Sequence, residues 1–502
     1  MKEMGQRQPG GKEGGVEEGE IRLFFARAID YNRLLLRRTK MKRLLSVVLL
    51  ILAMTVSSCG GGAATSGTGQ GGAAGTQTSG GTGAQATSAP GATGAPAATS
   101  APAGGGASSQ SGQAVTLRYG IWDKNQAPAM QKIVDSFKTT HPNINVKVEV
   151  TPFEQYWTKL ETAATGGSIA DIFWMNGPNF IKYASNQILL SIDDQIKADN
   201  VDLKNYPSSL VALYTYDGKH YALPKDFDTI GLWYNKTLFD AAGVKYPDET
   251  WDWNKLRDAA KQLTNSSKGV WGIAAQMANQ EGYYNTILQN GGYIISDDKK
   301  SSGYDKPETI EGLKIWTDMI KDKLSPTQAQ MTDTPPTSLF ESGKVAMLYG
   351  GSWNQIEFAQ NEYTKGKVDV AVLPQGKKRA TVIHGLGNVI SANTKYPKEA
   401  WEFAKFLGSK EAAEIQAKTG TVIPAYNGTQ DLWVKSNPNF HLQKLMDELA
   451  YAIPFPTSKN TAKWMDVETK DLTKAWSGTM SVDDAAKDIA KQMNQILADE
   501  QK

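Results

Sequence analysis

The chain has 502 residues, of which 40 % are hydrophobic and 21 % are charged. Its formal net charge is +2 and residues 1–59 alone carry +5, so the remainder of the chain carries −3. That remainder has no basic cluster large enough to bind nucleic acid, and a single cysteine excludes disulfides and thiolate metal sites.

The N-terminal part of the chain carries an export signal. A basic pair at 42–43 precedes an apolar run over 44–56, and small residues lead from this run to Cys59. The run is too short to cross a membrane as a mature helix, and the whole pattern is typical of a secretory signal. We therefore predict that residues 41–58 are a signal peptide.

Cys59 is the only cysteine of the chain. The sequence Val-Ser-Ser-Cys at 56–59 resembles the bacterial lipobox, in which the cysteine becomes the lipid-carrying N-terminus of the mature protein. A lone cysteine is often buried in a core instead, but this one lies between a signal sequence and a glycine tract. We expect a lipid on Cys59 to anchor the protein to the outer face of the cell membrane.

Residues 1–40 precede a signal sequence that is already complete from Met41. The pair Arg37-Arg38 is not followed by the residues of a twin-arginine signal. AGGAGG, a ribosome-binding sequence, encodes Arg-Arg, and this pair lies just upstream of Met41. We hypothesise that translation begins at Met41 and that residues 1–40 are upstream sequence. Arginine codons other than AGG at these positions would remove the argument.

A low-complexity segment follows the lipobox. Residues 60–112 are almost entirely Gly, Ala, Ser, Thr, Gln and Pro, without a charged or aromatic residue. Such a segment has too little apolar area to offset the entropy of ordering its backbone. We therefore expect 59–113 to be the lipidated cysteine and a disordered linker, with a reach on the order of 40 Å. An O-glycosylated stalk is the alternative, and it too would hold a folded body away from the membrane.

Residues 114–502 contain all 13 tryptophans and are numerous enough for two lobes. Alternating apolar residues predict a strand over 115–121, and apolar residues at helical spacing predict a helix over 129–139. A strand, a helix and a third strand follow at 146–150, 156–164 and 171–174. Strands separated by helices of this length predict a mainly parallel sheet with right-handed crossovers.

Ligands of such sheets bind beyond the carboxyl ends of the strands. Trp122, Asp123 and Lys124 follow the first predicted strand, and Trp174 and Asn176 lie at the end of the third. These residues are therefore candidates for a binding site.

The rest of the chain continues the alternation of strands and helices. An apolar strand is predicted over 230–234 and a helix over 251–263. A second buried strand begins at residue 343 and opens onto the glycine turn before Trp353. Helices are predicted over 398–407 and from a capping-box-like sequence at 481–484.

Export as a lipoprotein and a series of short motifs resemble the family 1 extracellular solute-binding proteins of ABC transporters, the sugar-binding components related to maltodextrin-binding protein. The motifs are Asp-Ile-Phe-Trp at 171–174, Tyr-Ala-Leu-Pro at 221–224 with the segment 232–239, Gly-Gly-Ser-Trp at 350–353, and the segment 477–486. Each motif is weak alone, but together they stand in order along residues 115–500.

The resemblance implies an α/β fold of two lobes, each with a central, mainly parallel sheet flanked by helices. The ligand cleft lies between the lobes, as in type II periplasmic binding proteins. The expected boundaries are 114–226 and 388–424 for lobe 1, 231–383 and 427–502 for lobe 2, and crossings near 227–231, 384–388 and 423–426.

The resemblance also implies a function. The protein would capture a carbohydrate, a mono- or oligosaccharide, and deliver it to ABC permease subunits that are powered by a separate ATPase. The chain itself has no Gly-x4-Gly-Lys-[Ser/Thr] loop, as that division of labour requires. We expect a monomer without cofactor or metal, and no enzymatic activity.

Sugars present an apolar C–H face and a rim of hydroxyls, so their sites combine aromatic rings with carboxylates and amides. Trp174 and Trp353 match aromatic sugar-stacking positions of the family, and Trp464 matches a third where the alignment slips by one residue. Trp122 is a further candidate, whereas Trp233 lies within an apolar strand and is expected in the core. Tryptophans on predicted helix faces, namely Trp157, Trp316 and Trp401, are also expected to pack in the core.

Polar contacts follow from the same resemblance. Asp123 and Lys124 match an acid–lysine pair in the first loop of maltodextrin-binding proteins. Asp228, with Thr229 beside it, falls on a carboxylate position at the first lobe crossing. The alternative for each charged residue is a solvated surface position.

Two further segments complete the candidate site. Glu281 and Tyr284 lie near another acidic and aromatic stretch of the family, where the register is open. Gly385 and Gly387 would let the backbone approach a ligand closely, or would serve only the hinge.

Two other classes of protein are alternatives. A membrane-tethered glycoside-processing enzyme would also carry many tryptophans and a pair of carboxylates. No Gly-x-Ser-x-Gly or His-Glu-x-x-His motif occurs, and the four histidines are scattered. A cell-surface adhesin would not close on small solutes. The sequences of the loops that would select a particular sugar do not indicate which sugar is bound.

Overall fold

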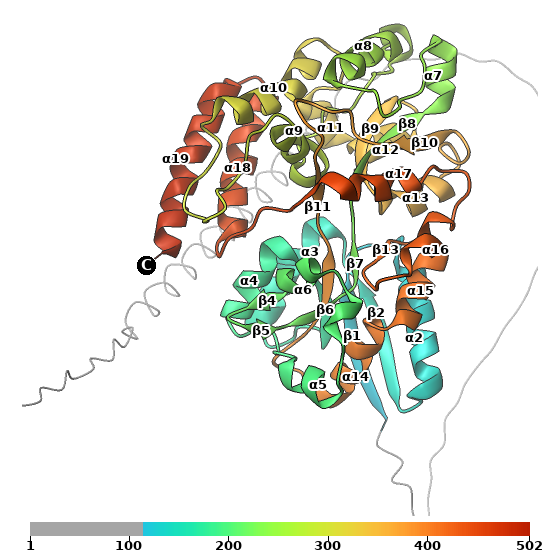
Figure 1. Ribbon diagram of the computed structural model, residues 1–502, viewed down its shortest axis with the longest axis vertical. Coiled ribbons are helices and arrows are strands. Elements are labelled where there is room, and N and C mark those ends of the chain that lie inside the picture. The colour runs from blue at the N-terminus through green and yellow to red at the C-terminus, as the bar shows by residue number, and fades with distance from the viewer. Residues whose placement is uncertain (1–113, 502) are drawn as a thin grey trace, which may run out of the picture. The chain divides into compact units, whose positions relative to one another are not determined.

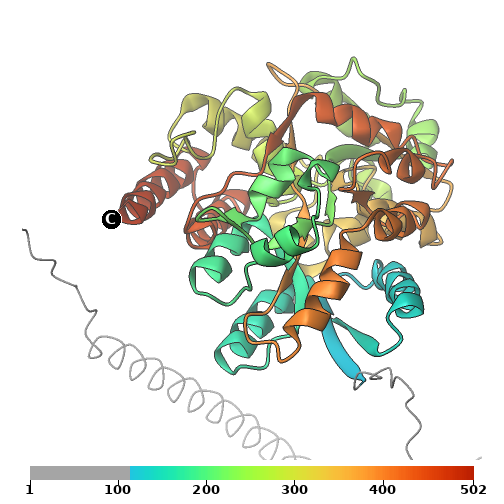
Figure 2. The same cartoon turned by 60° about the horizontal axis from the view of Figure 1, so that its bottom comes forward.

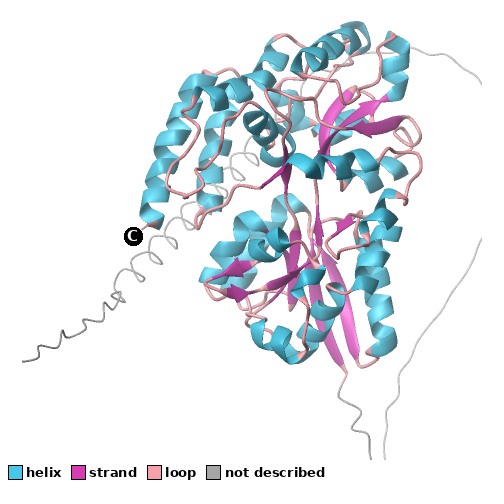
Figure 3. Cartoon of the chain, viewed as in Figure 1, coloured by secondary structure: helices cyan, strands magenta, loops and turns pink. Residues whose placement is uncertain are grey.

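Two separate β-sheets organise the computed structural model, which describes residues 114–501 (Figures 1 and 3). Each sheet forms the centre of one lobe, so the two-lobed α/β fold expected from the sequence is confirmed. The expected upstream extension, signal peptide, lipidated Cys59 and linker lie outside the described residues. Among residues 114–501, no helix is long and apolar enough to cross a membrane.

The lobe 1 sheet has the strand order β2-β1-β3-β12-β6. Strand β1 runs parallel to β2 and β3, whereas β12 runs antiparallel to both β3 and β6. Alternation in β3 divides the core between the two faces of the sheet. Ile172 and Trp174 pack with helices α2 and α14 on one face, and Phe173 and Met175 pack with α3 and α4 on the other. Helices thus cover both faces.

The strands and helices of lobe 1 have the following bounds: β1 Val115–Ile121, α2 Ala127–Thr140, β2 Ile144–Val150, α3 Phe153–Thr165, β3 Ile172–Asn176, α4 Gly177–Ser185, α5 Asp193–Ala198, α6 Ser208–Leu213, β4 Thr215–Tyr216, β5 Lys219–His220, β6 Ala222–Pro224, β12 Leu386–Ile390, α14 Pro397–Leu407, α15 Lys410–Lys418 and α16 Gln430–Val434.

The lobe 2 sheet has the order β10-β8-β9, and both of its ladders are antiparallel. This differs from the mainly parallel sheet expected in each lobe. Strand β8 enters lobe 2 directly from the first crossing, and it is antiparallel to β9 and β10, which both begin within lobe 2. Helices α18 and α19 lie side by side on the outer flank of this lobe (Figures 1 and 2).

The elements of lobe 2 have the following bounds: β8 Ile230–Asn235, α7 Lys236–Ala242, α8 Trp253–Leu263, the π-helix η3 Asn279–Tyr283, α9 Tyr284–Gln289, α10 Pro307–Lys321, α11 Gln328–Asp333, α12 Pro336–Glu341, β9 Met347–Gly351, α13 Asn354–Gln360, β10 Val368–Ala371, β11 Thr381–Ile383, α17 Gln443–Asp447, β14 Ala452–Pro454, α18 Thr461–Trp476 and α19 Val482–Glu500.

The chain crosses between the sheets through short extended segments. Strand β7, Asp226–Phe227, connects β6 to β8 and pairs with β13, Ile423–Pro424. Asp228 forms a bridge with His384, which lies between β11 and β12, so two crossings run side by side. After β13 the chain packs against lobe 1 through the contact of α16 with α15, and it returns to the lobe 2 sheet at α17.

Candidate functional site

A cavity of about 490 Å³ lies between the lobes at the crossings. Lobe 1 contributes the loop after β1, the start of α3 and the end of β3, and lobe 2 contributes η3 and the start of α13. Six residues predicted from the sequence line this cavity although they are far apart in the chain. They are Trp122, Asp123, Asn176, Asp228, Glu281 and Trp353.

The lobe 1 wall of the cavity is aromatic. The ring of Trp122 meets Phe153 edge to face at 5.7 Å and Trp174 at 5.0 Å between centroids. Phe153 is 48 % exposed, so it presents an open ring to the cavity that it lines. Phe153, and not Trp174, is thus the aromatic residue that is exposed at this wall beside Trp122.

Trp353 supplies the aromatic group of the lobe 2 wall. It follows β9, is partly exposed and packs against the lobe 2 core. Its ring lies over Gly351, where an added Cβ would come within 2.1 Å of the indole. The glycine turn seen in the sequence therefore makes room for the tryptophan rather than for a ligand.

A chain of polar contacts joins the first loop to the first crossing. Gln126 donates to Asp123 at 2.8 Å through Nε2 and accepts from Lys225 Nζ at 3.2 Å through Oε1. Lys225 is ion-paired with Asp226, and both side chains are almost completely buried. Asp226 Oδ1 also accepts from the backbone N–H of Leu386 at 2.8 Å. These hydrogen bonds and the ion pair thus connect the loop after β1 with the first crossing.

Burial changes the pKa of the carboxyl groups of Asp228, at the first crossing, and Glu281, in η3. Asp228 is 8 % exposed and its Oδ1 accepts from Gln280 Nε2 at 2.6 Å. Burial raises its pKa well above the ordinary value, and the charges of Asp226 and Glu281 raise it further. Burial also raises the pKa of Glu281, to about 7. His384 accepts from the backbone N–H of Gly177 at 3.0 Å, and burial lowers its pKa to about 4.

Three predicted aromatic residues do not line the cavity, because each is fully buried and hydrogen-bonded within its lobe. Trp174 donates through Nε1 to Tyr119 Oη at 2.6 Å, and Lys225 Nζ lies 4.4 Å from its ring centre. Tyr284 donates to Glu468 at 2.8 Å, and Trp464 donates to Ser458 Oγ at 2.9 Å. The structure assigns all three to packing, which corrects the expected stacking on Trp174 and Trp464 and the expected ligand contact of Tyr284.

The remaining predicted residues also lie outside the lining. Lys124 is exposed, and Thr229 is buried and donates to the backbone of Leu445 at 2.6 Å. An added Cβ would come within 2.4 Å of the Asp226 carbonyl at Gly385 and within 2.7 Å of Ala222 at Gly387. Gly385 therefore packs closely against β7 of the first crossing, and Gly387 packs closely against β6 within the lobe 1 sheet.

Asn176 has a structural task as well as a place in the lining. It is the N-cap of α4, where its Oδ1 accepts from the backbone N–H of Asn179 at 3.2 Å. An N-cap oxygen used in this way satisfies a helix donor. The side-chain oxygen of Asn176 therefore already accepts a hydrogen bond from the protein.

The sequence did not single out the other lining residues. Among them are Asn125, Gln126, Phe153, Glu154, Asp226, Phe227, Asn279, Gln280, Thr337, Asn354, Glu357, His384, Leu386 and Val422. Several of them could have been found from the sequence, because they neighbour predicted residues in the loop after β1, at the first crossing and in η3. Phe153 begins a helix that the sequence predicts only from its apolar spacing, and Glu357 lies in α13, which the sequence analysis did not predict.

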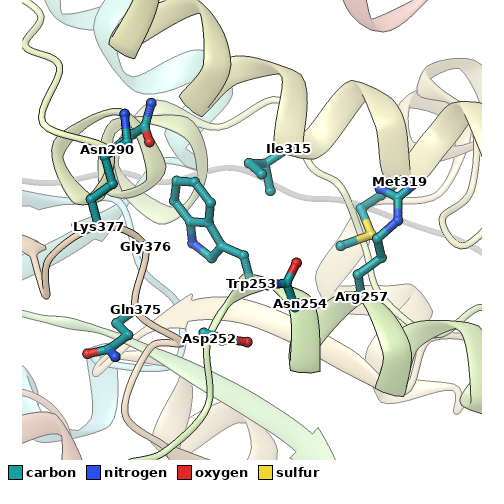
Figure 4. Close-up of a pocket in the computed structure, with 10 residues that line it drawn as sticks. All are labelled: Asp252, Trp253, Asn254, Arg257, Asn290, Ile315, Met319, Gln375, Gly376 and Lys377. Carbon is teal, nitrogen blue, oxygen red and sulfur yellow. The ribbon is translucent and has the colours of Figure 1, made fainter.

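A second cavity of about 400 Å³ lies within lobe 2 between α8, α10 and residues 375–377. Figure 4 shows the indole of Trp253 between Ile315 and the segment that carries Gly376. All of its lining residues belong to one lobe. A ligand there would have no differential contact with an open and a closed form. The cavity between the lobes is therefore the candidate site.

Residues 122–414 match the family described as bacterial extracellular solute-binding protein, which is more than half of the chain. The chain belongs to this family. The resemblance to extracellular solute-binding proteins that the sequence motifs indicated is thereby confirmed.

Relatives of this solute-binding protein cover most of its length. A binding protein of Brucella abortus is 25 % identical over 78 % of this chain and 95 % of its own. The maltotriose-binding protein of Pyrococcus abyssi is 25 % identical over 69 % of this chain and 75 % of its own. The ABC substrate-binding protein Lmo0181 from Listeria monocytogenes, solved in complex with cycloalternan, is 28 % identical with a TM-score of 0.73, and covers 77 % of this chain and 100 % of its own. Each of these relatives is described as a binding protein.

Proposed function

We propose that this protein is the extracytoplasmic substrate-binding component of an ABC importer, and that it captures a carbohydrate between its lobes. The observation that carries the proposal is the lining of the cavity. Trp122 and Phe153 from lobe 1 face the same space as Trp353 from lobe 2, and carboxyl and amide groups lie between them. Aromatic faces fit the C–H surface of a sugar ring, and the polar groups fit its hydroxyls.

Closure around the ligand follows from the same arrangement. Because the walls belong to different lobes, a sugar that touches both binds the closed form better than the open one. A closed, loaded form is the species that we propose docks on the permease subunits, with a separate ATPase supplying the energy. The names of relatives that bind maltotriose and cycloalternan support a carbohydrate ligand.

Membrane attachment through a lipid on Cys59 is a further part of the proposal. The protein would then be held on the outer face of the membrane by its linker. Cys59→Ser should move the protein from the membrane fraction to the soluble extracellular fraction. Persistence of the variant in the membrane fraction would contradict the lipid anchor and leave carbohydrate binding untouched.

The binding role is tested with a panel of mono- and oligosaccharides. The melting temperature of the protein is measured with each sugar, and each sugar is analysed for hydrolysis after incubation with the protein. A ligand at 100 times its Kd stabilises the folded state by about 2.7 kcal/mol, which raises the melting temperature by several degrees. Small-angle scattering should show a smaller radius of gyration with that sugar. Hydrolysis of the sugar would instead favour the enzyme, and no shift with any sugar would refute the proposal.

A further inference from the structure

One turn of π-helix, η3, supplies three consecutive polar residues to the lobe 2 wall of the cavity. They are Asn279, Gln280 and Glu281. Within this turn the backbone N–H of Tyr283 donates to the carbonyl of Ala278, five residues earlier, at 3.0 Å. Such turns are rare and are found frequently at functional sites. The contacts that hold η3 in this form therefore decide where its three polar groups lie.

The buried amide of Asn285 holds the turn. Asn285 is 0 % exposed and lies outside the lining of the cavity. Through Nδ2 it donates to the carbonyl of Gln280 at 2.7 Å and to that of Gly282 at 3.3 Å. Its Oδ1 accepts from the backbone N–H of Val382 in β11 at 2.9 Å. The side chain thus joins η3 to β11 through both its donor and its acceptor.

These contacts connect η3 to two of the lobe crossings. Strand β11 leads directly to His384, which lies at one of them. On the other side of the turn, Gln280 Nε2 donates to Asp228 Oδ1 at 2.6 Å. Asp228 belongs to the first crossing, and its backbone N–H donates to the carbonyl of His384 at 2.8 Å. The turn is therefore tied to the segments about which the lobes would move.

The amide has no substitute in the described structure. No other side chain of residues 114–501 donates to the carbonyls of Gln280 and Gly282. Tyr283 and Tyr284 donate to Glu468 Oε2 instead, at 3.4 and 2.8 Å, and both rings pack in the lobe 2 core. A buried carbonyl that loses its donor is unfavourable. Loss of the amide would therefore drive η3 to rearrange until its carbonyls found other donors.

We infer that Asn285 is a positioning residue of the candidate site, which sets where the three polar groups of η3 lie against a bound sugar. This inference rests on the proposed carbohydrate-binding function and adds to it a residue outside the cavity. Hydrogen bonds weaken steeply when their distance or angle departs from the preferred geometry. A displaced η3 misplaces several such groups at once, so affinity falls although no group that faces the cavity has been removed.

Calorimetry on the purified full chain tests the inference. The probes are glucose, galactose, maltose, cellobiose and maltotriose, and the sugar that binds the unaltered chain most tightly is used throughout. Asn285→Leu keeps the approximate size of the side chain and removes all of its hydrogen bonds. We expect it to weaken binding of that sugar roughly tenfold, because more than one hydrogen bond to the sugar is lost or distorted.

Asn235→Leu is the matched control. Asn235 is also 0 % exposed and belongs to lobe 2, but it caps α7 and donates to Tyr363 Oη at 3.3 Å, outside the cavity. Both variants should lower the urea midpoint, whereas only Asn285→Leu should weaken sugar binding. If either leucine variant does not fold, Asn285→Ser and Asn235→Ser, which each keep one donor, take their place.

A double-mutant cycle distinguishes positioning from a general loss of stability. Gln280→Ala with Glu281→Ala removes two of the groups through which Asn285 acts. In that background Asn285→Leu should weaken binding by a smaller factor than in the unaltered chain, because groups already removed cannot be misplaced.

The outcomes separate the inference from the function on which it rests. If Asn285→Leu binds the sugar as tightly as the unaltered chain, if Asn235→Leu weakens binding as much, or if the losses in the cycle simply multiply, the inference is wrong and carbohydrate capture stands. If neither these five sugars nor any other sugar of the panel binds the unaltered chain, the proposed function fails and the inference fails with it.

Discussion

Lys225→Met should destabilise the protein strongly, because it removes the partner of a buried carboxylate. The side chains of Lys225 and Asp226 are 1 % and 4 % exposed, so water cannot replace the lost charge. Two unit charges at 4 Å interact by about 4 kcal/mol at an effective dielectric constant of 20. Breaking a buried pair from one side costs roughly 3–5 kcal/mol, and we expect a loss of that size.

The double variant Lys225→Met with Asp226→Asn should recover much of the loss. It leaves no unpaired charge, and the amide oxygen can still accept from the Leu386 N–H, so a total loss of roughly 1–2 kcal/mol is expected. Lys314→Met is the matched control. Its partner Asp483 is 47 % exposed, and an exposed ion pair contributes about 0–1 kcal/mol.

Urea unfolding gives the free energies of unfolding of these variants. Unfolding is monitored by tryptophan fluorescence and by circular dichroism in parallel, because a two-lobed chain need not unfold in one step. The coupling between the two sites comes from the complete cycle of single and double variants. If Lys225→Met is as mild as Lys314→Met, or if the double variant is as unstable as the single one, the buried pair does not have the role described here.

Three further predictions concern the cavity walls and the buried carboxyls. Gly351→Ala should displace the Trp353 ring and weaken sugar binding at least tenfold in calorimetry, since a Cβ there would lie 2.1 Å from the indole; unchanged affinity would show that the ring position is unimportant. Phe153→Ala should weaken sugar binding with little change in the free energy of unfolding, because Phe153 is exposed. Trp174→Ala should instead lower the free energy of unfolding by roughly 3–5 kcal/mol, because Trp174 is buried. The reverse pattern would restore Trp174 as the stacking residue. Burial raises the pKa of Glu468 to about 8, so its contribution to stability is fully present below its unfolded pKa near 4.5 and is lost as the pH rises towards 8. Glu468→Gln should therefore flatten the fall of the urea midpoint between pH 5 and pH 9, and equal slopes would contradict this.

The positions of Trp122, Asp123 and Trp353 were predictable because each lies within two residues of the end of a strand with a clear apolar pattern. Trp174 shows where this reasoning fails. The sequence placed it at a strand end, but β3 continues to Asn176, so Trp174 is still within the sheet and points into the core. Every residue of β3 before Asn176 is buried, and such a strand has no alternation that reveals its faces.

Other features depend on contacts that a single sequence does not contain. An aromatic residue at the start of an amphipathic helix, such as Phe153, is ordinarily a core residue, and only the neighbouring Trp122 shows that it faces the cavity. Tyr284 follows a π-helix that changes the register of its side chains, and Glu468 is supplied by α18 far along the chain. Strand direction in lobe 2 likewise follows from the path of the crossings.

The crossing segments themselves line the cavity of the candidate site. Asp226, Phe227, Asp228 and His384 line the cavity and belong to the short segments that join the lobes. Hinge motions are absorbed at a few residues while the lobes stay rigid. Ligand contacts to these crossing residues therefore change little on closure, and they strengthen binding to the open and closed forms alike. Only contacts that require both walls, Trp122 and Phe153 on one side and Trp353 on the other, favour the closed form. Under the proposed function, contacts with the crossings add affinity for either form, whereas contacts with both aromatic walls add affinity for the closed form alone and thereby favour closure.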